Sequence, residues 1–395
     1  MKVKFSGLII VLIIFLSQPV TTLSAQDSSR LRISLLTCSP GDELYSLFGH
    51  SAIRVIDSNS VSDIVYNYGT FNFDDKGFYL KFIRGKLLYY ISTENFNDAD
   101  GYWGFKSLYQ QTNRGITEQV LDLSAAEKIN LRKSLNENLQ EANKYYKYDF
   151  FLDNCTTRLR DLIVKIKNPS PLLPAVMPAD TRFRQAIHQY LDKGKQHWSK
   201  LGIDILLGAP TDAVMTASQQ QFLPDNLMKA MDYSNPRTVR SSAELYQLSK
   251  TENAGSWFTP MFFFCSLLLL YVLLGFSKNK AMQMTLKGLD GLLFFTTGSL
   301  GIILIFMWTG TDHSMTKNNY NLLWALPSHI VCSFFIGSKN KIVKKYFLFT
   351  AISLVIVLLA WFFLPQQLNN ALIPFALLLL YRSLMIYFAT DNRNR

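Results

Sequence analysis

The chain contains few histidines and cysteines, and their positions exclude several classes of protein. Five histidines and four cysteines occur among its 395 residues. The histidines do not stand at metal-ligand spacing from cysteines or carboxylates, so the sequence predicts no metal site. It also has no glycine-rich phosphate loop, and we expect no cofactor. Basic residues are not interleaved with aromatic side chains in a patch, which argues against a nucleic-acid partner.

Acidic residues are scarce as well, with 29 Asp and Glu against 40 Lys and Arg. The mean hydropathy of +0.09 is high for a soluble enzyme, and the apolar residues are concentrated toward the C-terminus. Residues 26–255 have the composition of a globular domain, whereas residues 256–395 have that of a membrane domain. Residues 1–25 resemble a secretory signal peptide, because Lys2 and Lys4 precede an apolar stretch and a small-residue cleavage site. An uncleaved anchor is the alternative, and it leaves the next domain on the same side of the membrane.

Five apolar stretches near the C-terminus each have about the 20 residues that a bilayer crossing needs. They lie at 258–276, 287–308, 320–337, 346–364 and 371–389. Lysine and arginine are concentrated after the first, third and fifth stretches, and loops rich in these residues stay in the cytoplasm. The loops 309–319 and 365–370 contain a single such residue, Lys317, and are expected to face outward. We therefore expect a multi-pass protein of the inner membrane, with residues 26–255 in the periplasm and the C-terminus in the cytoplasm.

The exported domain is expected to have strands in its first half and helices in its second, which gives an α+β fold. A capping-box pattern, Ser124 followed by Glu127, begins a helix that runs to about Asn143. A second helix is expected from Asn154, and further short helices to about Leu248. β-branched and aromatic residues between turn residues predict strands at 31–37, 51–56, 64–68, 82–91 and 116–123.

Two short segments supply the two groups that thiol catalysis needs. His50 begins the expected strand 51–56, and alternation along this strand puts His50, Ala52 and Arg54 on the face opposite its apolar face. His50 is therefore expected to point toward a cleft. Cys155 follows Asp153 and Asn154, either of which is a good N-cap residue, and therefore lies in the first turn of the next helix. At a helix start, the dipole and the free amide groups favour a thiolate and can hold an oxyanion. We predict that His50 is the base that activates Cys155 as the nucleophile.

A third side chain should orient the imidazole. Asn67 and Tyr68 lie on the neighbouring expected strand and are both candidates, and the pattern does not choose between them. Arg54 and Asn154 are candidates for substrate binding. His313 is another, because it lies in the loop after the second apolar stretch, and polar side chains at a membrane edge can mark a substrate site.

The two catalytic candidates also have ordinary interpretations. A histidine at the start of a strand is often just partly exposed, and a cysteine on the apolar face of a helix is often inert core. Cys38 and Cys155 both lie in the exported domain, where the compartment permits a disulfide between them.

The order of the two groups, histidine before cysteine, is similar to the permuted branch of the papain-like, NlpC/P60-type fold. A closer resemblance covers nearly the whole mature chain and continues into the membrane segment. The segments that carry it in the exported domain are Thr37–Val55, Tyr66–Phe73, Arg114–Gln119, Asn154–Arg158 and Leu201–Gly208. In these segments the chain resembles the Lnb family of Bacteroidota.

This resemblance implies a lipoprotein N-acyltransferase with a permuted papain-like exported domain and a transmembrane bundle of about five helices. Such an enzyme takes an acyl chain from a phospholipid onto Cys155 as a thioester, with His50 as the base. It then passes the chain to the free amine of a diacylated lipoprotein acceptor at the inner membrane. A papain-like cysteine peptidase or amidase that acts on cell-envelope peptides is the alternative. A non-enzymatic membrane protein that binds a partner is a third hypothesis.

Overall fold

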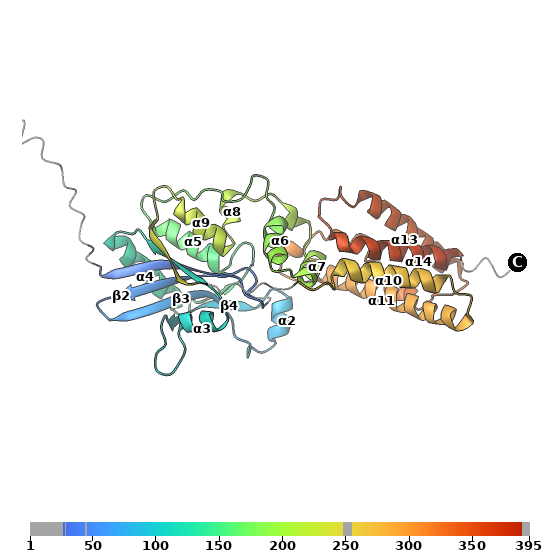
Figure 1. Cartoon of the computed structure of the whole chain (residues 1–395), viewed down its shortest axis with the longest axis horizontal. Helices are drawn as coiled ribbons and strands as arrows, with labels where there is room; N and C mark the ends of the chain where they lie inside the picture. The colour runs from blue at the N-terminus through green and yellow to red at the C-terminus, as the bar shows by residue number, and fades with distance from the viewer. Residues whose placement is uncertain (1–26, 28, 44–45, 248–254, 389–395) are drawn as a thin grey trace, which may run out of the picture.

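The computed structural model describes residues 27, 29–43, 46–247 and 255–388. The expected signal peptide, residues 1–25, lies outside these residues. The described residues form an α+β domain followed by a helical bundle, and the two lie end to end along the longest axis of the molecule (Figure 1). This division matches the change in composition along the sequence.

A seven-stranded antiparallel sheet forms the first domain, with the strand order β6-β4-β3-β2-β1-β5-β7. Four of its strands, β1, β2, β3 and β5, confirm the strands predicted from alternating and β-branched residues. The central pair, β1 and β2, places Cys38 directly opposite His50. The strands are β1 (Leu31–Cys38), β2 (His50–Asp57), β3 (Ser62–Thr70), β4 (Leu88–Asn95), β5 (Ile116–Leu121), β6 (Tyr145–Lys147) and β7 (Val239–Tyr246).

Helices cover both faces of the sheet. On one face lie α4 (Ala125–Leu139), α5 (Cys155–Ile166) and α9 (Pro224–Asp232), which pack against β1, β2 and β3. The capping box predicted at the start of α4 is present. On the other face, α3 (Phe105–Gln111) buries Ala52 under Phe105. Both faces of β2 are therefore packed. The face that carries His50, Ala52 and Arg54 is covered at Ala52, so it does not face a cleft along its whole length.

Two elements differ from the sequence predictions. Residues 82–91 do not form one strand, because α2 (Phe78–Ile83) ends inside this range and β4 starts at Leu88. Val239–Tyr246 was expected to be helical but forms the edge strand β7, which pairs with β5. This pairing joins segments far apart in the sequence, so local propensity did not indicate it.

Short helices connect the sheet to the bundle (Figure 1). They are α6 (Phe183–Lys193), α7 (His197–Leu206) and η1 (Ala209–Asp212), where η marks a 3₁₀-helix. The next helix, α8 (Ala217–Gln220), lies beside α9 over the sheet domain (Figure 1).

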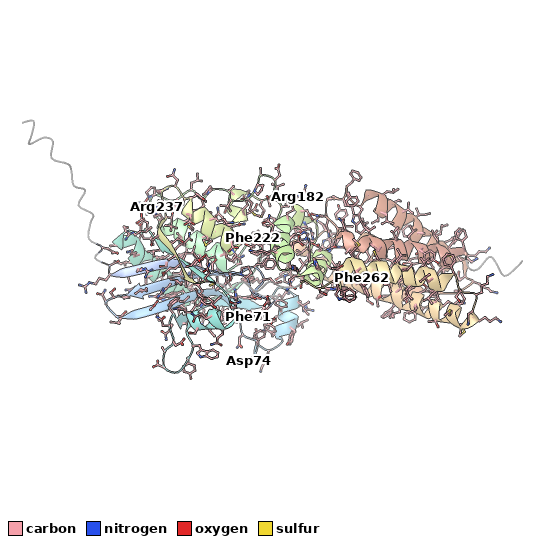
Figure 2. All side chains as sticks on the ribbon, in the orientation of Figure 1. Phe71, Asp74, Arg182, Phe222, Arg237 and Phe262 are labelled. Carbon is pink, nitrogen blue, oxygen red and sulfur yellow. The ribbon has the colours of Figure 1, made fainter. Side chains whose placement is uncertain are left out.

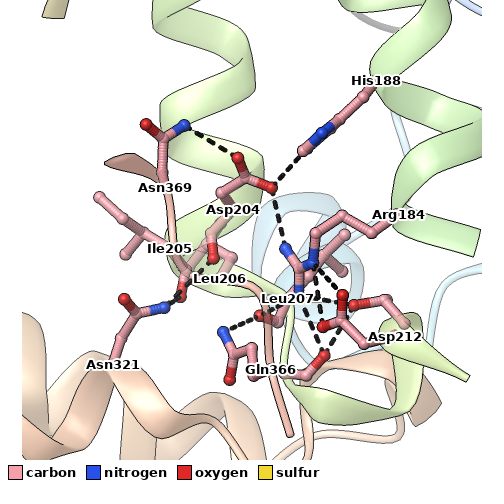
Figure 3. A network of polar contacts seen from close by, with 12 residues as sticks. Arg184, His188, Asp204, Ile205, Leu206, Leu207, Asp212, Asn321, Gln366 and Asn369 are labelled. Atoms are coloured by element: carbon pink, nitrogen blue, oxygen red, sulfur yellow. Dashed lines mark hydrogen bonds and ion pairs between the residues drawn. The ribbon is translucent and has the colours of Figure 1, made fainter. Parts of the chain in front are cut away.

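A buried polar network joins this connecting region to the bundle (Figure 3). The fully buried Arg184 of α6 donates to Asp204 at 2.8 Å and to Asp212 at 3.1 Å. From the bundle, Asn369 donates to the other carboxylate oxygen of Asp204 at 2.9 Å, and Gln366 donates to a backbone carbonyl at the end of α7 at 2.8 Å. The two domains are therefore held together by hydrogen bonds that are shielded from water.

Among the described residues of the bundle, three segments are long and apolar enough to cross a membrane, and α10 is a shorter apolar helix of 16 residues. These four match the first, second, fourth and fifth stretches expected from the sequence. The helices of the bundle are α10 (Pro260–Gly275), α11 (Lys280–Thr309), η2 (Ser314–Thr316), η3 (Tyr320–Leu323), α12 (His329–Ser333), α13 (Lys341–Ala360), η4 (Asn370–Leu372) and α14 (Ile373–Phe388).

The third expected stretch, 320–337, is not a single long helix but contains only the short η3 and α12. It runs along α11, so closely that a Cβ added at Gly298 or Gly301 would clash with the backbone of Ile330 or Ala325. Irregular backbone at membrane depth is tolerated when it is buried in protein, and small residues permit that close approach. Hydropathy identified this segment as apolar, but packing on the glycines of α11 decides its shape.

Candidate functional site

The strand β2 and the helix α5 bring His50 and Cys155 together. The imidazole forms a hydrogen bond with the Cys155 thiol, and its Nε2 lies 3.0 Å from Oδ1 of Asn67 on β3. Because an amide oxygen only accepts, Nε2 carries a hydrogen and donates it. The second ring nitrogen, Nδ1, is then left to exchange a proton with the sulfur.

Glu94 on β4 fixes the orientation of the Asn67 amide. Nδ2 of Asn67 donates to Oε1 of Glu94 at 2.5 Å, which turns Oδ1 toward His50. Sequence reasoning missed Glu94, because its role depends on the pairing of β3 with β4. The alternative candidate, Tyr68, has its hydroxyl bonded to Asn138 of α4 at 2.6 Å. Of the two neighbouring residues, the structure thus brings Asn67 to the imidazole.

The start of α5 is fastened to the start of β2. Asn154 caps the helix, and its side-chain oxygen accepts from the backbone N–H groups of Thr156 and Thr157. The Thr156 hydroxyl lies 3.1 Å from that of Ser51, and the backbone N–H of Ser51 donates to the sulfur of Cys155. These contacts fix the sulfur beside β2, as the predicted N-cap required.

Asn154 lines the cavity, but its side-chain amide is fully engaged within the protein, so its predicted role in substrate binding stays a prediction that these contacts do not favour. Its amide nitrogen donates to the carbonyl oxygens of Phe150 at 2.7 Å and Phe222 at 2.9 Å. Its oxygen takes up two of the backbone amides that were expected to face an oxyanion. The N–H of Cys155 itself lies outside this cap.

Gly49 allows the tight turn that delivers His50. Its φ is 81°, in the left-handed region, and an added Cβ would lie 2.7 Å from the carbonyl oxygen of Cys38. Only glycine fits both the backbone angle and the space. The Gly49-His50 pair in the sequence therefore has a structural cause.

The charges of His50 and Cys155 stabilise each other. Burial alone would raise the pKa of the Cys155 thiol, but the charge and the hydrogen bond of His50 outweigh it and lower this pKa to about 7. Burial lowers the pKa of His50, but the Cys155 thiolate and the hydrogen bonds from Cys155 and Asn67 outweigh it and raise this pKa. Both shifts favour a thiolate beside an imidazolium, which is the reactive form of a catalytic cysteine.

Alkylation of Cys155 by iodoacetamide is expected to follow a titration centred near pH 7. Since the thiolate reacts, the rate rises as the pH increases through the lowered pKa. In the variant His50→Ala the thiol stays buried without its cation, so its pKa moves above the ordinary 9.0 and the rate near pH 7 falls at least ~10-fold. Mass spectrometry of the Cys155 peptide across a pH series measures both titrations.

Cys38 is the internal control of that experiment, because burial raises the pKa of its thiol to about 12. It should stay unmodified in both proteins. The same titration in the wild type and in His50→Ala would contradict the pairing of the imidazole with Cys155.

Cys155 and His50 line a cavity of about 970 Å³. This volume is at the upper end of the range of about 300–1,000 Å³ that ligand sites occupy. Phe71 and Phe222, which both line it, are labelled in Figure 2. The cavity can accept a long apolar ligand next to the sulfur. Its wall is mainly apolar and is rich in aromatic side chains, among them Phe48, Phe71, Phe78, Tyr89, Tyr148 and Phe222.

Two family models match this chain. The model described as the Lnb N-terminal periplasmic domain matches residues 18–186, and the model described as the Lnb transmembrane domain matches residues 251–394. The chain belongs to the Lnb family. It is therefore a membrane protein with an N-terminal periplasmic domain, as the distribution of apolar residues predicted. No curated protein and no solved structure matches it.

Arg114 is a cation of the Lnb cavity that sequence reasoning did not select as a site residue. Its Nε donates to the carbonyl oxygen of Ser39 at 2.9 Å, and its guanidinium lies 4.5 Å from the ring centre of Tyr109. Within the described residues its buried Nη2 has no hydrogen-bond partner. The charge of Arg114 also acts to lower the pKa of His50, against the stronger effects that raise it. The sequence signal that could have identified Arg114 is the segment Arg114–Gln119, which is one of those that carry the family resemblance.

Arg54 is not among the residues that line the cavity of this Lnb protein, so its position does not favour the predicted role in substrate binding. It is buried and forms ion pairs with Asp63 at 2.6 Å and with Glu118 at 3.2 Å. Its guanidinium also lies 3.4 Å from the ring centre of Phe96. All of these partners belong to the sheet and its cover, so Arg54 holds strands together.

His313 and Cys38 are the two remaining residues for which there was an expectation from the sequence. His313 lines the cavity on the side of α2, where its Nε2 lies 3.1 Å from the carbonyl oxygen of Ile83. A role in substrate binding stays a prediction. Cys38 and Cys155 are both free thiols, so the alternative of a disulfide was wrong. Within the described part of the chain, no three His, Cys, Asp or Glu side chains gather as metal ligands.

Proposed function

We propose that this Lnb protein is a membrane-bound thiol acyltransferase. It N-acylates the diacylglyceryl-cysteine of bacterial lipoproteins with an acyl chain taken from a phospholipid. The observation that carries the proposal is the position of Cys155, His50 and Asn67 on the wall of an aromatic cavity of about 970 Å³. A reactive thiolate beside a large apolar space, in a chain with a transmembrane domain, fits chemistry on a lipid acyl chain.

In the first half of the reaction, the Cys155 thiolate attacks the ester carbonyl carbon of the phospholipid. The electrons move to the carbonyl oxygen, where the backbone N–H of Cys155 stabilises the negative charge. The ester C–O bond then breaks, and the imidazolium of His50 gives its proton to the departing glycerol oxygen. A lysophospholipid leaves, and Cys155 holds the acyl group as a thioester.

In the second half, the free amine of the lipoprotein attacks the thioester carbonyl. His50 accepts the proton from the amine nitrogen, the C–S bond breaks, and the thiolate is restored next to an imidazolium. Asn67 and Glu94 act as positioning residues that keep Nε2 of the ring protonated and turned away from the sulfur. The aromatic wall limits access of water, which would otherwise hydrolyse the thioester.

The guanidinium nitrogen of Arg114 that has no partner among the described residues is an argument for an acyl donor that carries a phosphate. A buried guanidinium nitrogen without a partner is costly, and it becomes satisfied when a ligand brings an acceptor. A phosphate oxygen is the acceptor that guanidinium groups bind best. In a cavity whose wall is mainly apolar, a nearby cation suits a molecule with an acyl chain and an anionic headgroup.

Replacing Arg114 by glutamine should therefore slow acylation of Cys155 by phosphatidylglycerol about 10- to 100-fold, the loss of one charge-assisted hydrogen bond. Acylation by diacylglycerol, which has the same ester but no phosphate, should change little. Mass spectrometry of intact protein measures both rates. Arg114→Lys is the control and should recover part of the loss. An equal loss with both donors would contradict phosphate recognition.

The proposed function is tested with the purified full chain in lipid nanodiscs. Without an acceptor, mass spectrometry should find an acyl group on Cys155. With a synthetic diacylated lipopeptide, it should find a triacylated product and an equal amount of lysophospholipid. Cleavage of cell-envelope peptides without acyl transfer would identify a papain-like peptidase or amidase instead. If neither acyl transfer nor peptide cleavage is detected, the result would indicate a non-enzymatic role.

We also propose that the C-terminus lies in the cytoplasm. The loop after α11 lies on the periplasmic side, since Asp312 in this loop forms an ion pair with Lys147 of the periplasmic domain at 2.9 Å. The lysine-rich segment between the third and fourth stretches then lies on the opposite side, as positively charged loops do. A cysteine added after residue 395 should be labelled by a membrane-impermeant maleimide only after cells are opened.

A further inference from the structure

The short helix α2 has apolar side chains on two sides. Phe78 and Phe82 are one turn apart and line the cavity of the catalytic thiol. Leu80 and Ile83 are not part of the cavity wall, and they are 56% and 46% exposed. Tyr79, at the edge between the two sides, is 77% exposed. A group of exposed apolar side chains at one place usually marks an interaction surface.

Contacts with the membrane domain fix the position of α2 relative to the membrane. The carbonyl oxygen of Arg84 accepts from the backbone N–H of Asp312 at 2.9 Å, and that of Ile83 lies 3.1 Å from Nε2 of His313. Asp312 and His313 follow directly after α11, which ends at Thr309 and is long and apolar enough to span the membrane. The C-terminal end of α2 therefore lies at the outer end of a membrane span. Figure 1 shows α2 on the side of the sheet domain nearest the bundle.

The charges around α2 fit a phospholipid surface better than an apolar protein partner. The exposed basic residues Lys76, Arg84 and Lys86 flank the helix on both sides and outnumber the exposed acidic residue there, Asp74. The neighbouring Asp75 is ion-paired with Lys81 of the helix at 2.7 Å. Cationic side chains at the edge of an inserted apolar face are attracted to anionic headgroups. Because the cavity continues from α2 to Cys155, a lipid chain that enters beside α2 has an apolar path to the sulfur.

We propose that α2 is the lipid portal of this protein. Its outer side, formed by Leu80 and Ile83, inserts into the outer leaflet of the inner membrane, and its inner side admits the acyl chain of a phospholipid to the cavity. Insertion into the leaflet is independent of the reaction, whereas delivery of the chain to Cys155 rests on the proposed function. The two statements are tested separately.

Insertion is tested by placing a photo-crosslinking amino acid at position 80 of the full chain in nanodiscs of phosphatidylethanolamine and phosphatidylglycerol. The matched control is position 61. Val61 is 93% exposed and lies in the turn between β2 and β3, at the end of the sheet away from the bundle (Figure 1). We expect lipid adducts at position 80 and none at position 61. Equal yields at both positions, or a protein adduct at position 80, would overturn the portal.

Delivery is tested with Leu80→Glu and with Val61→Glu as the control. Loss of one inserted leucine should slow acylation of Cys155 by bilayer phosphatidylglycerol about 10-fold. Dihexanoyl phosphatidylglycerol, dissolved as monomers, has the same headgroup but does not need to leave a bilayer, so its rate should fall much less. Equal losses with both donors would overturn delivery through α2. If the wild type forms no acyl-enzyme with either donor, the proposed reaction fails, and the crosslinking experiment alone decides the insertion.

Discussion

The variant Cys155→Ala should lose lipoprotein N-acylation to the background level, a decrease of at least ~10⁴-fold if the chemistry proceeds through a thioester. The side chain removed is the group that would carry the acyl chain, and the described residues offer no second thiol with a lowered pKa to replace it. The measurement is the mass of lipoprotein N-termini from cells that depend on the variant. The same protein in nanodiscs should form no acyl-enzyme.

Two further variants distinguish loss of the nucleophile from general damage. Cys265→Ala changes an exposed cysteine of α10 and should keep full activity. Cys155→Ser keeps a hydroxyl group of similar size in the same position, but its much higher pKa should leave it nearly as inactive as alanine. Continued N-acylation by Cys155→Ala would refute the assignment of the nucleophile, provided that no other acyltransferase is present in the cells.

The second large effect concerns stability rather than chemistry. Replacing Arg184 by methionine should destabilise the connecting region by about 3–5 kcal/mol, which corresponds to a decrease in melting temperature of about 10 °C. The side chains of Asp204 and Asp212 are 2% and 1% exposed. The variant leaves Asp212 without its cation and leaves Asp204 with only His188, whose Nε2 lies 2.8 Å from it. Scanning fluorimetry of the full chain in detergent measures the shift.

The control for this experiment lies on the same helix. Lys193→Met removes an exposed cation from the last turn of α6 and should change the stability by less than ~1 kcal/mol. A similar melting temperature for Arg184→Met and Lys193→Met would show that the network in Figure 3 contributes little to folding. Because this network also binds Asn369 and Gln366 of the bundle, we expect the contact between the two domains to weaken in the Arg184 variant.

Local patterns predicted the parts of the site that depend on neighbouring residues. Asn154 or Asp153 was expected to be the N-cap, and the structure has Asn154 as the cap and Cys155 at the first position of α5. The alternating residues around His50 predicted the strand that carries it. Capping and strand propensity act over a few residues, so one sequence is enough to detect them.

Residues that act through distant parts of the chain were missed or misread. Arg54 was expected to be a candidate for substrate binding, but Glu118 from β5 and Phe96 contact its guanidinium. Glu94 was not predicted, because its hydrogen bond to Asn67 depends on the alignment of β4 with β3. In both cases the partner is fixed by strand pairing across the sheet, for which the local sequence has no signal.

The sequence by itself determined the two compositions of the chain, the helix start at Cys155, the strand start at His50 and the apolar stretches of the bundle. Each of these depends on hydrophobicity or on backbone preferences that are set locally. The tertiary structure decided that Asn67 rather than Tyr68 meets the imidazole, that an aromatic cavity surrounds the sulfur, and that the third apolar stretch is broken against α11. These features arise where surfaces from distant segments pack against each other, and complementary packing is a property of the folded chain.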